Sequence, residues 1–147
     1  MNDTFHYRYL EDIAPADAAF EARGDTKEEM IIASVDALMN VMVENLDGIG
    51  VREGRSLHVE AKSLEMLLFH LLEELIFLKD ADGLFLRVLA VRFSQNSNGM
   101  ALDAKVCGEE IDPAKHDLNV DVKAVTLHRF GVKKDAHGWM ATVVLDI

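Results

Sequence analysis

The sequence predicts an α+β domain in which two helices pack on mainly antiparallel β-sheet. Apolar residues repeat every second position at the start of the chain and throughout its second half, as on half-buried strands. Between residues 26 and 79 the apolar residues twice recur with helical spacing instead. Each helical stretch is preceded by a residue suited to cap it. A length of 147 residues fits one domain, residues 1–147, with one core.

Two strands are expected first. Phe5, Tyr7 and Tyr9 alternate with polar neighbours, and the same alternation returns over residues 18–22. Pro15 lies between the two runs and is expected in the turn that joins them.

A helix should follow from Thr26. Thr26 and Glu29 have the spacing of a capping box, in which each side chain satisfies a backbone amide of the other residue. Apolar residues between 30 and 41 occupy more than one face, so we expect this helix to be covered on more than one side. Gly48 and Gly50 mark its exit.

The remaining elements are one strand, a second helix and four strands. Leu57, Val59 and Ala61 alternate as a strand, and Ser63 is placed to cap a helix that runs to about Lys79. The last four strands are expected at Leu84 to Phe93, Met100 to Cys107, Asn119 to about Val132 and Trp139 to Ile147, with hairpin turns at Asn98-Gly99 and His137-Gly138. The predicted order is ββαβαββββ.

Composition excludes several classes of protein. The net charge of −11 opposes binding to a phosphate backbone, so no direct nucleic-acid binding is expected. No stretch is typical of a signal peptide or a membrane span, so we expect no membrane association. Cys107 is the one cysteine, which favours a reducing, cytoplasmic location. The oligomeric state is left open.

Known catalytic motifs are absent from the sequence. It contains no phosphate-binding glycine loop, no nucleophile elbow and no zinc-binding helix motif. We therefore expect no catalytic residues and a protein that is not an enzyme. His116 lies in a polar segment between strands where functional side chains are often displayed, although a simple connecting loop explains it equally well.

The chain end suggests a cation site. A hydrophobic strand runs directly into Asp146 and Ile147, which together offer a side-chain carboxylate and an α-carboxylate. These are hard oxygen donors of the kind that bind calcium or magnesium, provided that further oxygens come from elsewhere.

Several short motifs follow one another along the chain: Tyr7-x-x-Leu10-Glu11, Asp17 before Phe20-Glu21-Ala22-Arg23-Gly24, Thr26-x-Glu28-Glu29, Leu71-Leu72-Glu73-Glu74-Leu75 through Asp82-Gly83, Gly108-Glu109 to Asp112-Pro113-Ala114-Lys115-His116, Val122 to His128, and Val143 to Ile147. In this order and spacing they resemble the archease family over essentially the whole chain. The resemblance implies a non-enzymatic accessory protein that activates the RtcB-type RNA ligase of tRNA splicing and RNA repair. This ligase joins a 3′-phosphate or cyclic phosphate to a 5′-hydroxyl with GTP and manganese. The accessory protein promotes its guanylylation and its multiple turnover.

The resemblance also implies site residues. The family's metal ligands match Asp17, Asp146 and Ile147, with calcium as the first expectation and magnesium or manganese as alternatives. Lys115 is the first candidate for a basic residue needed in ligase activation, with Lys123 second and His116 beside them.

One departure affects the N-terminal metal ligand. The family usually reads Glu-His-Thr-Ala-Asp, whereas this chain has two more residues and no histidine between Glu11 and Asp17. Asp12 can replace Asp17 as a ligand, both can contribute, or Asp12 is a solvated turn residue, which is the reading we favour. Two rival functions remain: a general chaperone or interaction module with a structural metal, and a metal-dependent hydrolase assisted by His116 and His128.

Overall fold

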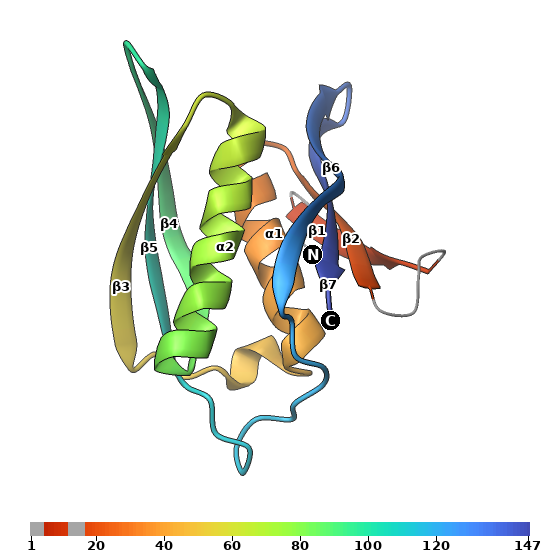
Figure 1. Ribbon diagram of the computed structural model, residues 1–147, viewed down its shortest axis with the longest axis vertical. Helices are drawn as coiled ribbons and strands as arrows, with labels where there is room; N and C mark the ends of the chain where they lie inside the picture. The colour runs from red at the N-terminus through yellow and green to blue at the C-terminus, as the bar shows by residue number, and fades with distance from the viewer. Residues whose placement is uncertain (1–4, 12–16) are drawn as a thin grey trace.

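The computed structural model describes residues 5–11 and 17–147 (Figure 1). The strands are β1 (Phe5–Leu10), β2 (Asp17–Gly24), β3 (Glu53–Ala61), β4 (Leu84–Asn96), β5 (Gly99–Glu110), β6 (Ala124–Asp135) and β7 (Gly138–Asp146), and the helices are α1 (Lys27–Met42), the short 3-10 helix η1 (Leu46–Gly48) and α2 (Leu64–Asp82). Apart from η1, the order ββαβαββββ is confirmed. The predicted turn at Pro15 lies outside the described residues.

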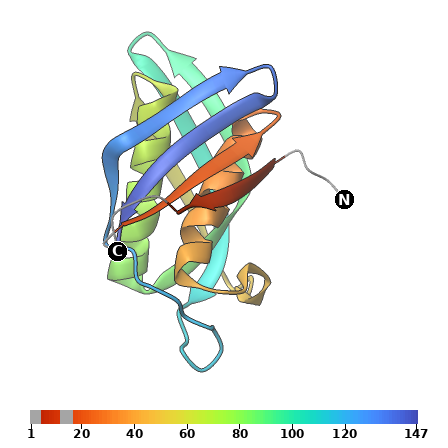
Figure 2. The same cartoon turned by 90° about the vertical axis from the view of Figure 1, so that its right-hand side faces the viewer.

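The helices lie between two sheets, so the fold has three layers (Figures 1 and 2). One sheet has four strands in the order β1-β2-β7-β6, and the other has three in the order β3-β5-β4, with all pairings antiparallel. Helix α1 contacts β1, β2 and β7 on one side and β4 on the other, and α2 likewise contacts strands of both sheets. The predicted α+β class is confirmed, and each helix is enclosed because sheet covers both of its sides.

Helix α1 forms where the sequence predicts it. The Thr26 side chain accepts a hydrogen bond from the backbone N–H of Glu29, whose carboxylate accepts from the Thr26 N–H. Most of the helix is buried, including Asp36, which is 5% exposed. Its carboxylate accepts two hydrogen bonds of 3.1 Å from Arg87 of β4, and this pairing makes a carboxylate tolerable inside the layer.

Helix α2 also has the predicted cap and an ordinary C-terminal end. The Ser63 hydroxyl accepts from the Met66 amide, and Gly83 ends the helix in the left-handed region with φ 64°. A residue with a Cβ is disfavoured there, which explains why glycine terminates the helix. The helix continues three residues past the predicted end at Lys79, to Asp82. No helix within residues 5–11 and 17–147 has the length and hydropathy to cross a bilayer.

The start of β6 differs from the prediction. Residues 119–123 alternate like a strand, but β6 begins only at Ala124. The preceding segment is instead attached to the end of α1: the Asn119 amide donates to the Met42 carbonyl, and Leu118 forms a bridge with Val43. The hydrogen bonds of this segment therefore go to the end of α1 and not to a neighbouring strand. The alternation of apolar residues in the sequence does not distinguish these two partners.

Strand β6 is irregular along the outer edge of its sheet. Thr126 pairs with Val144 and Gly131 with Thr142, so residues 127–130 face the single residue Val143. Arg129 within this bulge has φ 55°, a left-handed backbone conformation. The bulge separates a straight pairing near the chain end from a second one near the hairpin turn at His137-Gly138, which is confirmed.

Candidate functional site

The two carboxylates predicted to bind a metal face each other across two strands. Asp17 is the first residue of β2 and Asp146 the last residue of β7, and they are direct partners in the antiparallel pairing. Directly opposed residues on antiparallel strands place their side chains on the same face, with Cβ atoms about 4.5–5.5 Å apart. Residues 129 positions apart in the sequence are thus brought to one place by the register.

The neighbours of Asp146 fix its position. Ala124 of β6 pairs with it on the other side, and the Lys123 amide donates a 2.8 Å hydrogen bond to the Asp146 carbonyl. Ile147 follows and packs at the edge of the core. Lys123 therefore reaches this cluster through its backbone, while its side chain is exposed. Asp12 lies outside the described residues.

The donor chemistry of this cluster suits a hard cation. Asp17, Asp146 and the carboxylate of Ile147 are all anionic oxygen groups, which calcium and magnesium prefer. None of the ion pairs formed within the described residues involves Asp17 or Asp146, so no side chain of that part of the chain pairs with either carboxylate. Within that same part of the chain, no three His, Cys, Asp or Glu side chains are grouped to hold a metal ion. Two aspartates are too few oxygen ligands for calcium, so a site here needs further donors.

A second cluster surrounds Glu109 at the end of β5. Lys115 Nζ lies 2.6 and 2.8 Å from the two carboxylate oxygens, and His116 Nε2 lies 2.9 Å from Oε2. The backbone N–H of Gly50 donates to the same oxygen, and Arg52 Nε lies 3.3 Å from Oε1. Glu109 is 4% exposed, so these donors replace the water that the carboxylate has lost.

These contacts define the protonation of the cluster. Hydrogen bonds from Lys115, Gly50 and His116 lower the pKa of Glu109 to about 2. His116 Nδ1 accepts a hydrogen bond from the Asp112 amide, so Nε2 carries the ring proton and donates it to Glu109. His116 is buried and therefore ties the loop after β5 to the core, a structural role that the sequence left open.

Lys115 is held in place but is accessible. Its side chain is 44% exposed and lies on the wall of an open cavity of about 560 Å³, which Arg52 and Asp112 also line. Gly50 permits the tight approach to Glu109, because a Cβ there would lie 2.8 Å from Oε1. The predicted residues Lys115 and His116 are thus brought together. No hydrogen bond or ion pair between described residues joins them to Asp17 or Asp146.

Lys79, near the end of α2, contacts the segment that precedes β6. Its side chain is 5% exposed, and Nζ donates to the Val122 carbonyl at 2.8 Å and to Asp121 at 2.6 Å. The adjacent Lys123 amide is hydrogen-bonded to Asp146, so Lys79 indirectly holds the segment that supports the chain end. Burial lowers the pKa of Lys79, but hydrogen bonds from Lys79 to Asp121 and Asp80 outweigh burial and raise it.

Sequence reasoning did not select Glu109, Arg52 or Lys79 as site residues. Glu109 belongs to one of the archease-like motifs, Gly108-Glu109 to His116, but neither that motif nor its place at a strand end indicates burial. Lys79 sits at the C-terminal end of a helix, a common place for a solvated lysine. Both acquire partners that lie far along the chain, Gly50 for Glu109 and Val122 for Lys79.

The fold and the facing carboxylates define a class of small α+β proteins whose helix pair is enclosed by two antiparallel sheets. A solution structure of Methanobacterium thermoautotrophicum protein 1598 has this fold, with a TM-score of 0.82, 28% identity and coverage of 99% of this chain and 100% of that one. The crystal structure of an archease, described as a possible chaperone, from Thermotoga maritima shares the fold with a TM-score of 0.61 at 21% identity, covering 94% and 97% of the two chains.

The sequence comparisons identify the family. Residues 7–147 match the model of the archease protein family (MTH1598/TM1083). Protein archease of Pyrococcus abyssi is 38% identical over 143 residues, which cover 97% of this chain and 96% of that protein. Protein archease of Pyrococcus furiosus is 36% identical over 148 residues, with both chains covered in full. The chain belongs to the archease family.

Proposed function

We propose that this protein activates an RtcB-type RNA ligase, promoting its guanylylation and repeated turnover in tRNA splicing and RNA repair. Membership of the archease family supports an accessory role. The observation that carries the proposal is the pairing of Asp17 with Asp146, because two carboxylates on neighbouring strands can share one cation.

The site works through a bound divalent cation, with calcium as the first choice. The cation would be held by Asp17, Asp146 and the Ile147 carboxylate and would offset their mutual repulsion. The chain's own contribution is rigidity, since Asp146 has strand partners on both sides. Lys115 supplies a positive charge on the exposed side of a buried carboxylate, where it can meet an anionic group of the ligase.

Calcium binding is tested first, on the isolated protein. A calcium concentration about 100 times Kd stabilises the folded state by about 2.7 kcal/mol, which raises the Tm of a domain of this size by roughly 5–10 °C. Asp146→Asn and Asp17→Asn should abolish the rise. Asp103→Asn, at an exposed position in the other sheet, serves as the matched control and should keep it. A calcium response that survives both site substitutions contradicts the assignment.

Activation is tested by measuring guanylylation of the purified ligase with GTP and manganese. The wild-type protein should increase the rate and allow many ligation cycles per ligase molecule. Asp146→Asn, or residues added after Ile147, should remove the stimulation while the circular dichroism spectrum stays unchanged. Full stimulation of the ligase by both variants would refute the proposal. Suppression of aggregation of unrelated proteins without any effect on the ligase would point to a general chaperone.

A further inference from the structure

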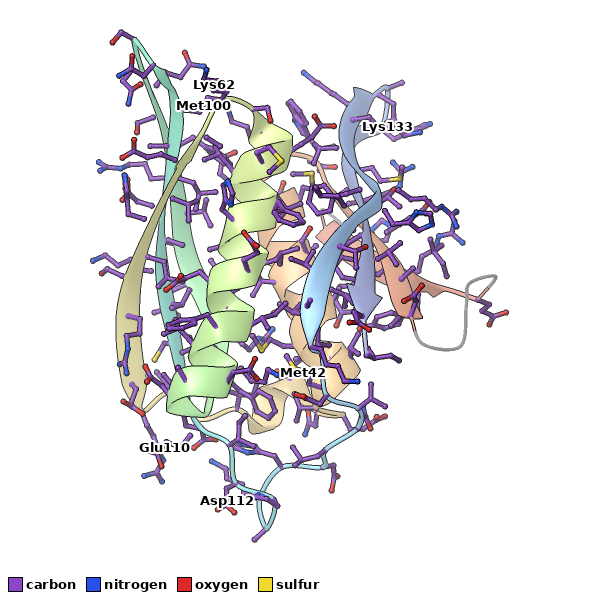
Figure 3. All side chains as sticks on the ribbon, viewed as in Figure 1. Met42, Lys62, Met100, Glu110, Asp112 and Lys133 are labelled. Atoms are coloured by element: carbon purple, nitrogen blue, oxygen red, sulfur yellow. The ribbon has the colours of Figure 1, made fainter. Side chains whose placement is uncertain are left out.

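Glu110 and Asp112 lie at one end of the molecule (Figure 3). Two adjoining hollows are lined there by residues at the end of β5 and in the segment that joins β5 to β6. The apolar hollow has a volume of about 270 Å³, and its walls include Met42, Phe85, Leu118 and Val120. The polar hollow is the cavity of about 560 Å³ beside Lys115. Ile111 lines both, so the two form one surface, which we call the base groove.

Apolar side chains are exposed at the base groove on a fixed backbone. Leu118 is 46% and Val120 47% exposed, although both are large and apolar. Their backbone is not loose, because the Asn119 and Val120 amides donate to the carbonyls at the end of α1. A preformed apolar hollow bordered by exposed apolar side chains is the usual form of a site that receives an anchor residue from a partner.

Uncompensated negative charge borders the same groove. In the part of the chain that the structure describes, the lining of the two hollows holds three cations, Arg52, Lys79 and Lys115, against five carboxylates, Glu53, Glu109, Glu110, Asp112 and Asp121. Lys115 and Arg52 both contact Glu109, and Lys79 contacts Asp121. The other lining carboxylates include Glu110 and Asp112, both exposed, and within the described residues neither is paired with a cation. With a net charge of −11 for the chain, this border attracts positive charge.

We propose that the base groove docks a segment of the ligase that inserts an apolar side chain beside a lysine or arginine. The apolar side chain enters between Leu118 and Val120, and the cation meets Glu110 and Asp112. This assignment rests on the proposed function, because it names the ligase as the occupant. It places affinity for the ligase at the base groove, apart from the carboxylates at the chain end.

The test measures the Kd of the full-length protein for the purified ligase by calorimetry. Leu118→Lys combined with Val120→Lys should weaken binding about tenfold or more, since it removes the apolar contact and adds repulsion to an incoming cation. Leu89→Lys is the matched control, because Leu89 is 65% exposed and lies at the bulge of β4 in the three-stranded sheet. This variant should bind the ligase with the wild-type Kd. Glu110→Lys is a second variant whose binding should weaken less and depend less steeply on salt.

The outcomes separate this proposal from the function on which it rests. In one outcome, the wild-type protein binds and stimulates the ligase while the double variant and Glu110→Lys bind it with unchanged Kd values. That result overturns the docking proposal for the base groove but not the proposed function. A wild-type protein that neither binds nor stimulates the ligase overturns both proposals. Loss of binding in the groove variants, with wild-type Tm values and normal binding by Leu89→Lys, establishes the surface.

Discussion

Replacing Lys79 with methionine should loosen the support of the chain end while leaving most of the protein intact. Methionine keeps the apolar length of the side chain but removes the N–H donor that the Val122 carbonyl accepts from. Val122 is fully buried, so its carbonyl would lack a hydrogen-bond partner. A buried acceptor without a partner costs about 1–3 kcal/mol. The lost contacts to Asp121 and Asp80 add little, because both carboxylates are more than half exposed.

The cost should appear locally, in the segment that Lys79 holds. An opening free energy lowered by about 1–3 kcal/mol speeds amide exchange by about 5- to 150-fold. Native-state hydrogen exchange followed by NMR should therefore show faster exchange of the Lys123 amide, which is bonded to Asp146. Amides in the middle of α1 should exchange at the wild-type rate.

Lys105→Met provides the matched comparison. Lys105 donates to Ser56 on the exposed face of the three-stranded sheet, so its loss should leave the Lys123 amide unchanged. Unchanged exchange at Lys123 in Lys79→Met would refute the proposed support. Equally faster exchange at every amide would also refute it, because that result indicates global destabilisation.

Two further predictions concern buried carboxylates. Arg87→Met leaves Asp36 without its cation and should lower the free energy of unfolding, measured by urea denaturation, by about 2–4 kcal/mol. Arg92→Met, on the exposed part of the same strand, is the control and should change this free energy by about 0.5 kcal/mol or less. Equal losses of stability in the two variants would contradict the argument. Because its pKa is lowered from 4.5 to about 2, Glu109 contributes stability that is present above its ordinary pKa and is lost as the pH falls through about 2. Glu109→Gln should therefore be less stable than wild type near neutral pH, with a gap that narrows on acidification, and a constant gap would exclude this linkage.

Local chemistry allowed the helices to be predicted. Thr26 with Glu29, and Ser63, are capping residues whose partners lie three residues away, so sequence spacing is sufficient information. The spread of apolar residues around α1 also indicated cover on more than one side. The second sheet that provides this cover depends on pairings between distant strands, and the sequence did not specify how many sheets would form.

The candidate site was predictable only in part. Asp146 was indicated by the chemistry of the chain end and Asp17 by the family resemblance, and the register of β2 with β7 places them together. Their role as metal ligands stays a prediction, as do the roles of Lys115 and Lys123 in ligase activation. The surroundings of Glu109 could not be predicted, because a buried carboxylate is recognisable only once its distant donors, such as the Gly50 amide, are in place.

The bulge of β6 has a consequence for how the protein behaves at high concentration. The outer edge of a sheet offers unpaired amides and carbonyls to any other extended chain, which is a common route to aggregation. Residues 127–130 interrupt this edge with a left-handed turn at Arg129, and exposed His128 and Arg129 add polar bulk. An incoming strand finds only two short regular runs, residues 124–126 and 131–135, so the bulge limits extension of the sheet at this edge.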